Sequence, residues 1–106
     1  MQHYAKGFLQ RDQLDKAVNA MIPLLGPDVE RLRYSLEEDW SGDPAIFFKI
    51  VLSEDASRDD RFLEAISRIE AAIDRLLDPQ LEWGLFCYIN YRGHAEFSAR
   101  QDAAWV

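Results

Sequence analysis

The sequence predicts an α+β fold, a two-layer sandwich in which a small, mainly antiparallel sheet of three strands carries two helices on one face. Three patterns indicate this class. Residues 10–22 and 58–77 repeat apolar side chains at helical spacing, whereas residues 29–38 and 45–52 have strand character. Residues 85–91 form a third strand-like run. The expected order along the chain is therefore α-β-β-α-β.

The first helix is expected from about Gln10 to Ile22. Pro23 lacks the N–H group that would continue the helical hydrogen bonding, so the regular helix should end or kink there. Its apolar residues recur at three- and four-residue steps, as on one face of an amphipathic helix: Leu14, Ala17, Val18, Met21 and Ile22.

The next two segments are expected to form a hairpin joined by a tight turn at residues 40–44. The first strand, Val29–Glu38, alternates apolar and polar residues as a half-buried strand does. The second strand, Ala45–Leu52, is apolar on both faces apart from Lys49. Its two faces are Ile46, Phe48, Ile50 and Leu52 on one side and Ala45, Phe47 and Val51 on the other.

A second helix, about Arg58–Leu77, should begin at a capping box formed by Ser57 and Asp60 and end before Pro79. A right-handed crossover then returns the chain to the sheet as a third strand, Leu85–Tyr91. This strand places Leu85, Cys87 and Ile89 towards the helices and Phe86, Tyr88 and Asn90 on the far face.

Composition predicts one soluble, cytoplasmic domain spanning residues 1–106, of which 95–106 form a flexible or docking tail. The chain has a single cysteine, and we find no secretory signal and no apolar run that could cross a membrane. The net charge is −7, and residues 28–60 hold ten acidic and four basic residues. Such a field repels phosphate backbones, so we expect neither direct nucleic-acid binding nor a membrane partner.

The far face of the sheet is the first candidate site, because no predicted helix remains to cover it. Phe47, Val51, Phe86 and Tyr88 all belong to that face. Exposed apolar patches of this kind often mark association surfaces, and the simplest association is a symmetric homodimer. The alternative is that the tail folds back and covers the patch with Phe97 and Trp105.

Four acidic residues around the hairpin turn form the second candidate site. Three interpretations stay open: a solvated turn in which Ser41 and Asp43 bond local backbone groups, an acidic surface for a basic partner, and a cation site. Their spacing follows no known metal-binding loop. The four residues are Glu37, Glu38, Asp39 and Asp43.

No catalytic motif is present, so we assign no catalytic residue, no cofactor and no metal. His94 follows the third strand and is expected to be an ordinary surface residue. Cys87 falls on the helix-facing side of its strand, where cysteine behaves as a small, unreactive apolar residue.

The sequence therefore favours a non-catalytic protein-interaction module that forms a homodimer or binds a basic protein. One specific version is an antitoxin- or immunity-like protein that covers the basic site of a nucleic-acid-cleaving partner. The competing hypothesis is a small-ligand or enzymatic domain using Tyr34, Tyr88, Arg92 and His94. The predicted interface residues are Phe47, Val51, Phe86, Tyr88, Trp40 and Trp105.

Overall fold

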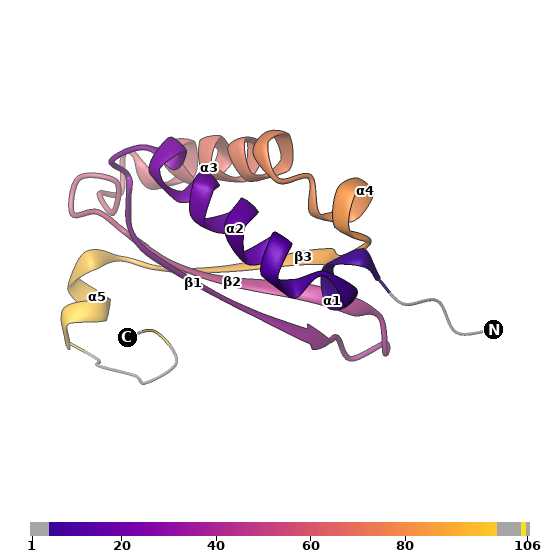
Figure 1. The fold of residues 1–106 in the computed structure, drawn as a ribbon. Helices are drawn as coiled ribbons and strands as arrows, with labels where there is room; N and C mark the ends of the chain where they lie inside the picture. Colours follow the sequence, from indigo (N-terminus) through magenta and orange to yellow (C-terminus); the bar gives the residue numbers. More distant parts are fainter. Residues whose placement is uncertain (1–4, 100–104, 106) are drawn as a thin grey trace.

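The computed structural model describes residues 5–99 and 105 and has the α+β architecture that the sequence predicts. A three-stranded sheet carries the longer helices on one face and a short C-terminal helix at the end of the other (Figure 1). The elements are α1 (Lys6–Leu9), α2 (Arg11–Met21), the 3-10 turn η1 (Ile22–Leu25), β1 (Val29–Glu38), β2 (Pro44–Leu52), α3 (Phe62–Leu76), α4 (Pro79–Trp83), β3 (Phe86–Arg92) and α5 (His94–Ala99).

The sheet has the order β1-β2-β3 and is mixed rather than mainly antiparallel. β1 and β2 form the expected antiparallel hairpin, with Tyr34 opposite Phe48. β3 pairs with the other side of β2 in parallel, with Phe48 opposite Ile89. The connection through α3 and α4 returns the chain to the end at which β2 began, and a strand that starts from that end must run parallel to β2.

The main core lies between this sheet and the helices above it. Ile46, Phe48 and Ile50 of the central strand are fully buried against α2 and α3. Gly7 of α1 touches this core so closely that a Cβ atom there would lie 2.6 Å from Leu85 Cδ1. The buried helical residues are Leu14, Val18 and Met21 of α2 and Ala65, Ile69, Ala72 and Ile73 of α3.

Two local features differ from the sequence prediction. α3 begins at Phe62, because Ser57 does not cap it: the Ser57 hydroxyl donates to the carbonyl of Ser53 at 2.6 Å and accepts from the backbone N–H of His94 at 3.0 Å. The short helices α1 and α4 lie outside the predicted elements, since four or five residues are too few to show helical periodicity. α4 buries Trp83, which is 8% exposed.

A buried ion cluster connects the start of the hairpin to α3. Asp28, only 5% exposed, accepts hydrogen bonds from Arg61 at 3.2 and 3.3 Å and also pairs with Arg68. Desolvation alone would raise the pKa of Asp28, but the Arg61 hydrogen bond and the Arg68 charge outweigh it, so the pKa is lowered. The backbone carbonyl of Asp28 also accepts from the N–H of Ser53 at 2.8 Å. Asp28 therefore holds both ends of the hairpin beneath α3.

Within the part of the chain that the structure describes, no helix combines the length and the hydrophobicity that a membrane crossing requires.

We predict that Asp28→Asn lowers the free energy of unfolding by about 1–2 kcal/mol near pH 7. This loss is smaller than that expected for a fully buried ion pair, because both arginine side chains are partly exposed to water. The lowered pKa means that ionised Asp28 contributes fully above the unfolded-state value of about 3.9. This contribution is lost as the pH falls through the folded-state pKa. Urea unfolding at pH 7 and below pH 4 measures it, and the difference between wild type and variant should shrink in acid.

Asp60→Asn is the matched control, because Asp60 pairs with Arg58 on the surface. We expect the control to unfold like the wild type. Equal destabilisation by the two changes, or a difference that grows in acid, would contradict the role given to Asp28.

Candidate interaction surface

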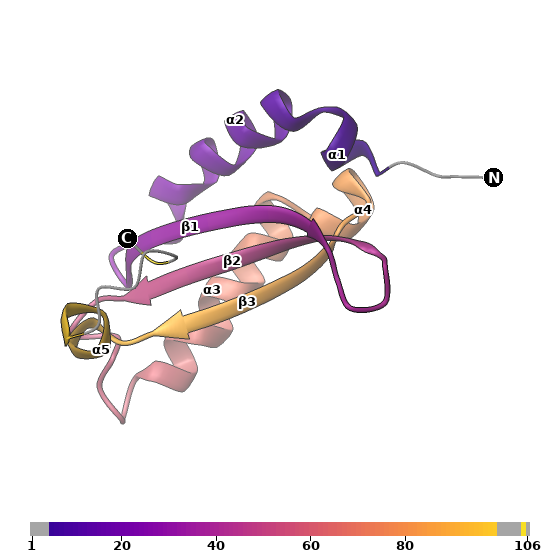
Figure 2. The ribbon, with the colours of Figure 1, turned by 90° about the horizontal axis from the view of Figure 1, so that it is seen from below.

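Seen from below, the three strands present an open face with α5 at one end (Figure 2). The strand pairing arranges the residues of this face in four rows, with one residue from each strand in a row. The pairing places the four predicted patch residues on this face, as their alternation along the strands indicated. From the hairpin turn outwards the rows are Glu37–Ala45–Phe86, Ser35–Phe47–Tyr88, Arg33–Lys49–Asn90 and Arg31–Val51–Arg92.

An aromatic cluster occupies the end of this face nearest the turn. The Tyr88 ring stacks on Phe47 with centroids 5.1 Å apart and an interplanar angle of 21°. Trp40 of the turn contacts Tyr88 at 5.1 Å and is itself 81% exposed. Phe86 is 43% exposed beside them. These four side chains, here called the aromatic cluster, present ring surface from three separate segments of the chain.

Asp39 holds the turn against this cluster. Its Oδ1 accepts from the backbone N–H groups of Ser41 at 2.9 Å and Asp43 at 3.0 Å, and its Oδ2 accepts from the Tyr88 hydroxyl at 2.8 Å. Gly42 has φ = 82°, a left-handed conformation that favours glycine. Desolvation opposes ionisation of Asp39, yet the hydrogen bonds from Tyr88 and the two backbone groups lower its pKa. The same bond, together with desolvation, raises the pKa of Tyr88.

The four predicted acidic residues thus divide into two kinds. Asp39 is a structural acceptor, whereas Glu37, Glu38 and Asp43 are exposed and form no side-chain hydrogen bond or ion pair with other described residues. The local bonding of the turn uses the Asp39 side chain and only the backbone of Ser41 and Asp43. Among residues 5–99 and 105, no three Asp, Glu, His or Cys side chains gather as a metal site.

The end of the open face away from the turn is covered by the C-terminal segment. Arg92 lies over the Trp105 ring at 4.5 Å, and Arg31 lies over the Phe97 ring at 5.8 Å. Val51 is consequently 1% exposed and Trp105 is 7% exposed. Phe97 and Trp105 thus cover the Val51 end of the patch. Tail residues 100–104 and 106 lie outside the described part of the chain.

The residues of the competing ligand-site hypothesis lie on both faces of the sheet and at the junction of β3 and α5. Tyr34 faces the helices, where desolvation and its 2.7 Å hydrogen bond to Asp15 raise its pKa to about 12. Tyr88 bonds Asp39 on the opposite face, and the Arg92 guanidinium stacks on the Trp105 ring. His94 Nδ1 is 2.7 Å from Glu30 Oε1. Tyr34 and Tyr88 thus lie on opposite faces of the sheet, whereas Arg92 and His94 are neighbours in the sequence at the junction of β3 and α5.

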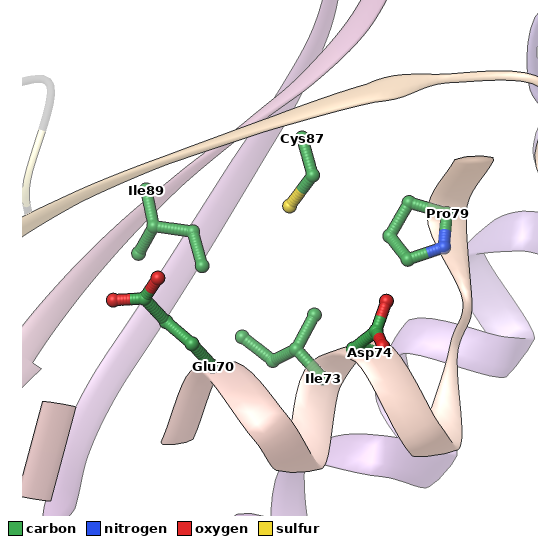
Figure 3. Close-up of a pocket in the computed structure, with 6 residues that line it drawn as sticks. All are labelled: Glu70, Ile73, Asp74, Pro79, Cys87 and Ile89. Carbon is green, nitrogen blue, oxygen red and sulfur yellow. The ribbon is translucent and has the colours of Figure 1, made fainter. Parts of the chain in front are cut away.

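A groove beside β3 is a feature that the sequence did not predict. It has a volume of about 280 Å³ and is lined by Glu70, Ile73, Asp74, Pro79, Cys87 and Ile89 (Figure 3). Cys87 faces the helices as expected, but β3 is an edge strand, so this residue is exposed rather than part of the core. Its sulfur points towards α3, where desolvation and the nearby charges of Glu70 and Asp74 raise the pKa of the thiol to about 11.

Comparison of the chain with protein-family models, with curated proteins and with solved structures finds no match.

We predict that Tyr88→Phe loosens the turn, because it removes the hydroxyl group that bonds Asp39. Amide hydrogen exchange at Ser41 and Asp43 should accelerate. Tyr34→Phe is the matched control, since it removes a tyrosine–aspartate bond on the other face. Unchanged exchange at the turn in Tyr88→Phe, or equal acceleration in both variants, would contradict the role of Asp39.

We also predict that Cys87 is a slow thiol. At pH 8 its alkylation by iodoacetamide should be roughly a hundredfold slower than that of a free thiol of pKa about 8.5, because only the thiolate attacks. The rate should rise about tenfold per pH unit until the pH approaches 11. Mass spectrometry of the single cysteine follows the reaction, and a rate that levels off near pH 9 would contradict this assignment.

Proposed function

We propose that this protein is a cytoplasmic protein-interaction module that binds a second copy of itself through the open face of its sheet. The observation that carries the proposal is the aromatic cluster with opposite charges on its two sides. Acidic residues of the turn lie on one side, and the row of Arg33 and Lys49 lies on the other. The single, unpaired cysteine supports a reducing compartment.

The aromatic cluster supplies apolar surface for such an interface. Trp40 is almost fully exposed and Phe86 partly so, while Phe47 and Tyr88 are half-buried by their mutual stacking. Aromatic side chains are enriched at the centres of protein interfaces because they bury a large area at a low cost in conformational entropy. The bond between Tyr88 and Asp39 fixes the ring before binding, which reduces the entropy that association must overcome.

The charge pattern selects the second copy over a basic partner. Arg33 and Lys49 form no ion pair with other described residues, so both are available to carboxylates from outside. A uniformly basic partner would satisfy the turn acids but repel this row. A copy of the same face, turned by 180°, satisfies both ends at once.

Symmetry defines the arrangement. In the proposed dimer the open faces of the two copies pack against each other, and the two-fold axis runs between them, perpendicular to the strands and parallel to the row of Phe47 and Tyr88. Rotation about this axis reverses the order of the rows in the second copy, so that its third row lies opposite the first row of the first copy. Glu37, in the first row, would face Arg33 in the third row of the second copy, and the aromatic rows would meet at the axis.

Antitoxin-like binding of a basic, nucleic-acid-cleaving protein is the second candidate, and the exposed Glu38, Asp43 and Trp40 of the turn favour it. It uses the turn alone and does not require Arg33. The two candidates therefore differ in what replacement of Arg33 should do.

Sedimentation equilibrium at micromolar concentrations tests the dimer. We expect Trp40→Ala and Tyr88→Asp each to raise the dissociation constant about tenfold or more, as loss of a central aromatic contact does. Leu24→Asp is the matched control, because Leu24 is 64% exposed on η1, at the helical layer. A wild-type chain that stays monomeric would overturn the proposal.

Charge reversal tests the symmetry. Glu37→Lys and Arg33→Glu should each weaken self-association about tenfold, because each variant places like charges opposite one another. An equimolar mixture of the two variants should recover association, because both facing pairs become complementary in the mixed dimer. Failure of the mixture to recover, with both variants folded, would contradict the proposed pairing of rows.

A further inference from the structure

The two edges of the sheet are protected to very different degrees. β1 carries charged residues along its length and has a register shift between Val29 and Arg31, both of which discourage another strand from pairing with it. β3 has no proline, and from Phe86 to Tyr91 it has no charged residue and no register shift against β2. Within the described residues its outer edge pairs with no other strand.

The groove lies along this unprotected edge. Its apolar lining comes from Ile73, Pro79 and Ile89, and the carboxylates of Glu70 and Asp74 stand on the α3 side (Figure 3). Cys87 and Ile89 occupy every second position of β3, and both side chains lie on the side of the strand that faces α3. A strand added to this edge would direct every second side chain into the same space.

We propose that the edge of β3 binds an extended, basic segment of a partner protein as a fourth strand. Backbone hydrogen bonds to β3 supply affinity, and a lysine or arginine side chain of the segment lies in the groove between Glu70 and Asp74. The segment carries basic residues at alternate positions, because only those side chains point towards α3. This surface uses the outer edge and the helix-facing side of β3, whereas the aromatic cluster uses the opposite side of the same strand, so the proposal does not depend on the homodimer.

The same charges argue against a second copy at this edge. Two β3 strands paired about a two-fold axis would place the two α3 helices next to each other. Glu70 and Asp74 of both copies would then meet with like charge, which is unfavourable. The carboxylates thus act against self-pairing while favouring a basic strand.

The segment also suits the groove in size. A volume of about 280 Å³ holds one long side chain, and the methylene groups of lysine or arginine pack on apolar surface while the charged end reaches a carboxylate. Glu70 accepts a 3.3 Å hydrogen bond from Tyr91, which holds its carboxylate over the groove.

The experiment uses a fluorescent eight-residue peptide in which lysine alternates with valine, and anisotropy measures its binding to the full chain. Two matched peptides serve as controls. One has glutamate in place of lysine, and the other keeps every side chain but carries N-methyl groups on the amides that would donate to β3. We expect each control peptide to bind at least about tenfold more weakly, because the first reverses the charge and the second removes the backbone bonds.

Protein variants locate the site. Glu70→Gln combined with Asp74→Asn should weaken binding of the lysine peptide about fivefold to tenfold, since two ion pairs are lost. The matched control, Glu54→Gln combined with Asp12→Asn, removes two exposed charges elsewhere and should change binding less than twofold. Trp40→Ala should bind the peptide normally, which separates this test from that of the dimer.

Two results of these experiments would overturn the proposal. Binding that N-methylation does not weaken would show attraction by net charge alone and would overturn the proposal. So would equal losses in the groove variant and its control. Hydrogen exchange without peptide tests for a second copy at this edge. If the amides of β3 become more protected as the protein concentration rises, the edge pairs with another copy of the chain and the proposal is overturned.

Discussion

The arrangement of this protein depends on the burial of its central strand on both faces. Ile46, Phe48 and Ile50 are covered by α2 and α3, and these helices can cover only one side of the sheet. Ala45 and Val51, on the other side, are also fully buried, although they lie outside the main core. Burial of apolar area contributes about 25 cal/mol per Å², so a second cover is a substantial gain for a small domain. The C-terminal segment supplies that cover at the Val51 end.

This partial cover divides the open face into regions of different chemistry. Trp105 and α5 close one end, and the turn presents aromatic and acidic groups at the other. Arg33 and Lys49 lie between them. The proposed dimer uses the order of charges along the strands, which would be complementary to itself after a half-turn. In the proposed strand addition, the edge of β3 would offer a different kind of contact, in which backbone groups and an acidic groove act together.

Much of the fold could be predicted because the spacing of apolar residues in the sequence is clearly periodic. The bounds of β1 agree with the prediction, and the other two strands differ from it by one residue at their ends. The acidic turn and the patch residues were also identified from local pattern. The short helix α4 and the Asp28 cluster were missed, because a five-residue helix has no period and an ion pair across 33 residues leaves no local signal. Cys87 was expected in the core because alternation gives the face of a residue but not the position of its strand in the sheet.

The sequence by itself determined which residues form strands and helices, which face each strand residue occupies, and where the negative charge lies. These properties depend on neighbours within a few positions, and so they can be read from local spacing. Only the tertiary structure decided that β3 pairs in parallel at an edge, that Trp105 covers Val51, and that Tyr88 links β3 to Asp39 of the turn. Each of those outcomes depends on the packing of segments far apart in the chain, where many arrangements satisfy the same local pattern and packing selects one of them.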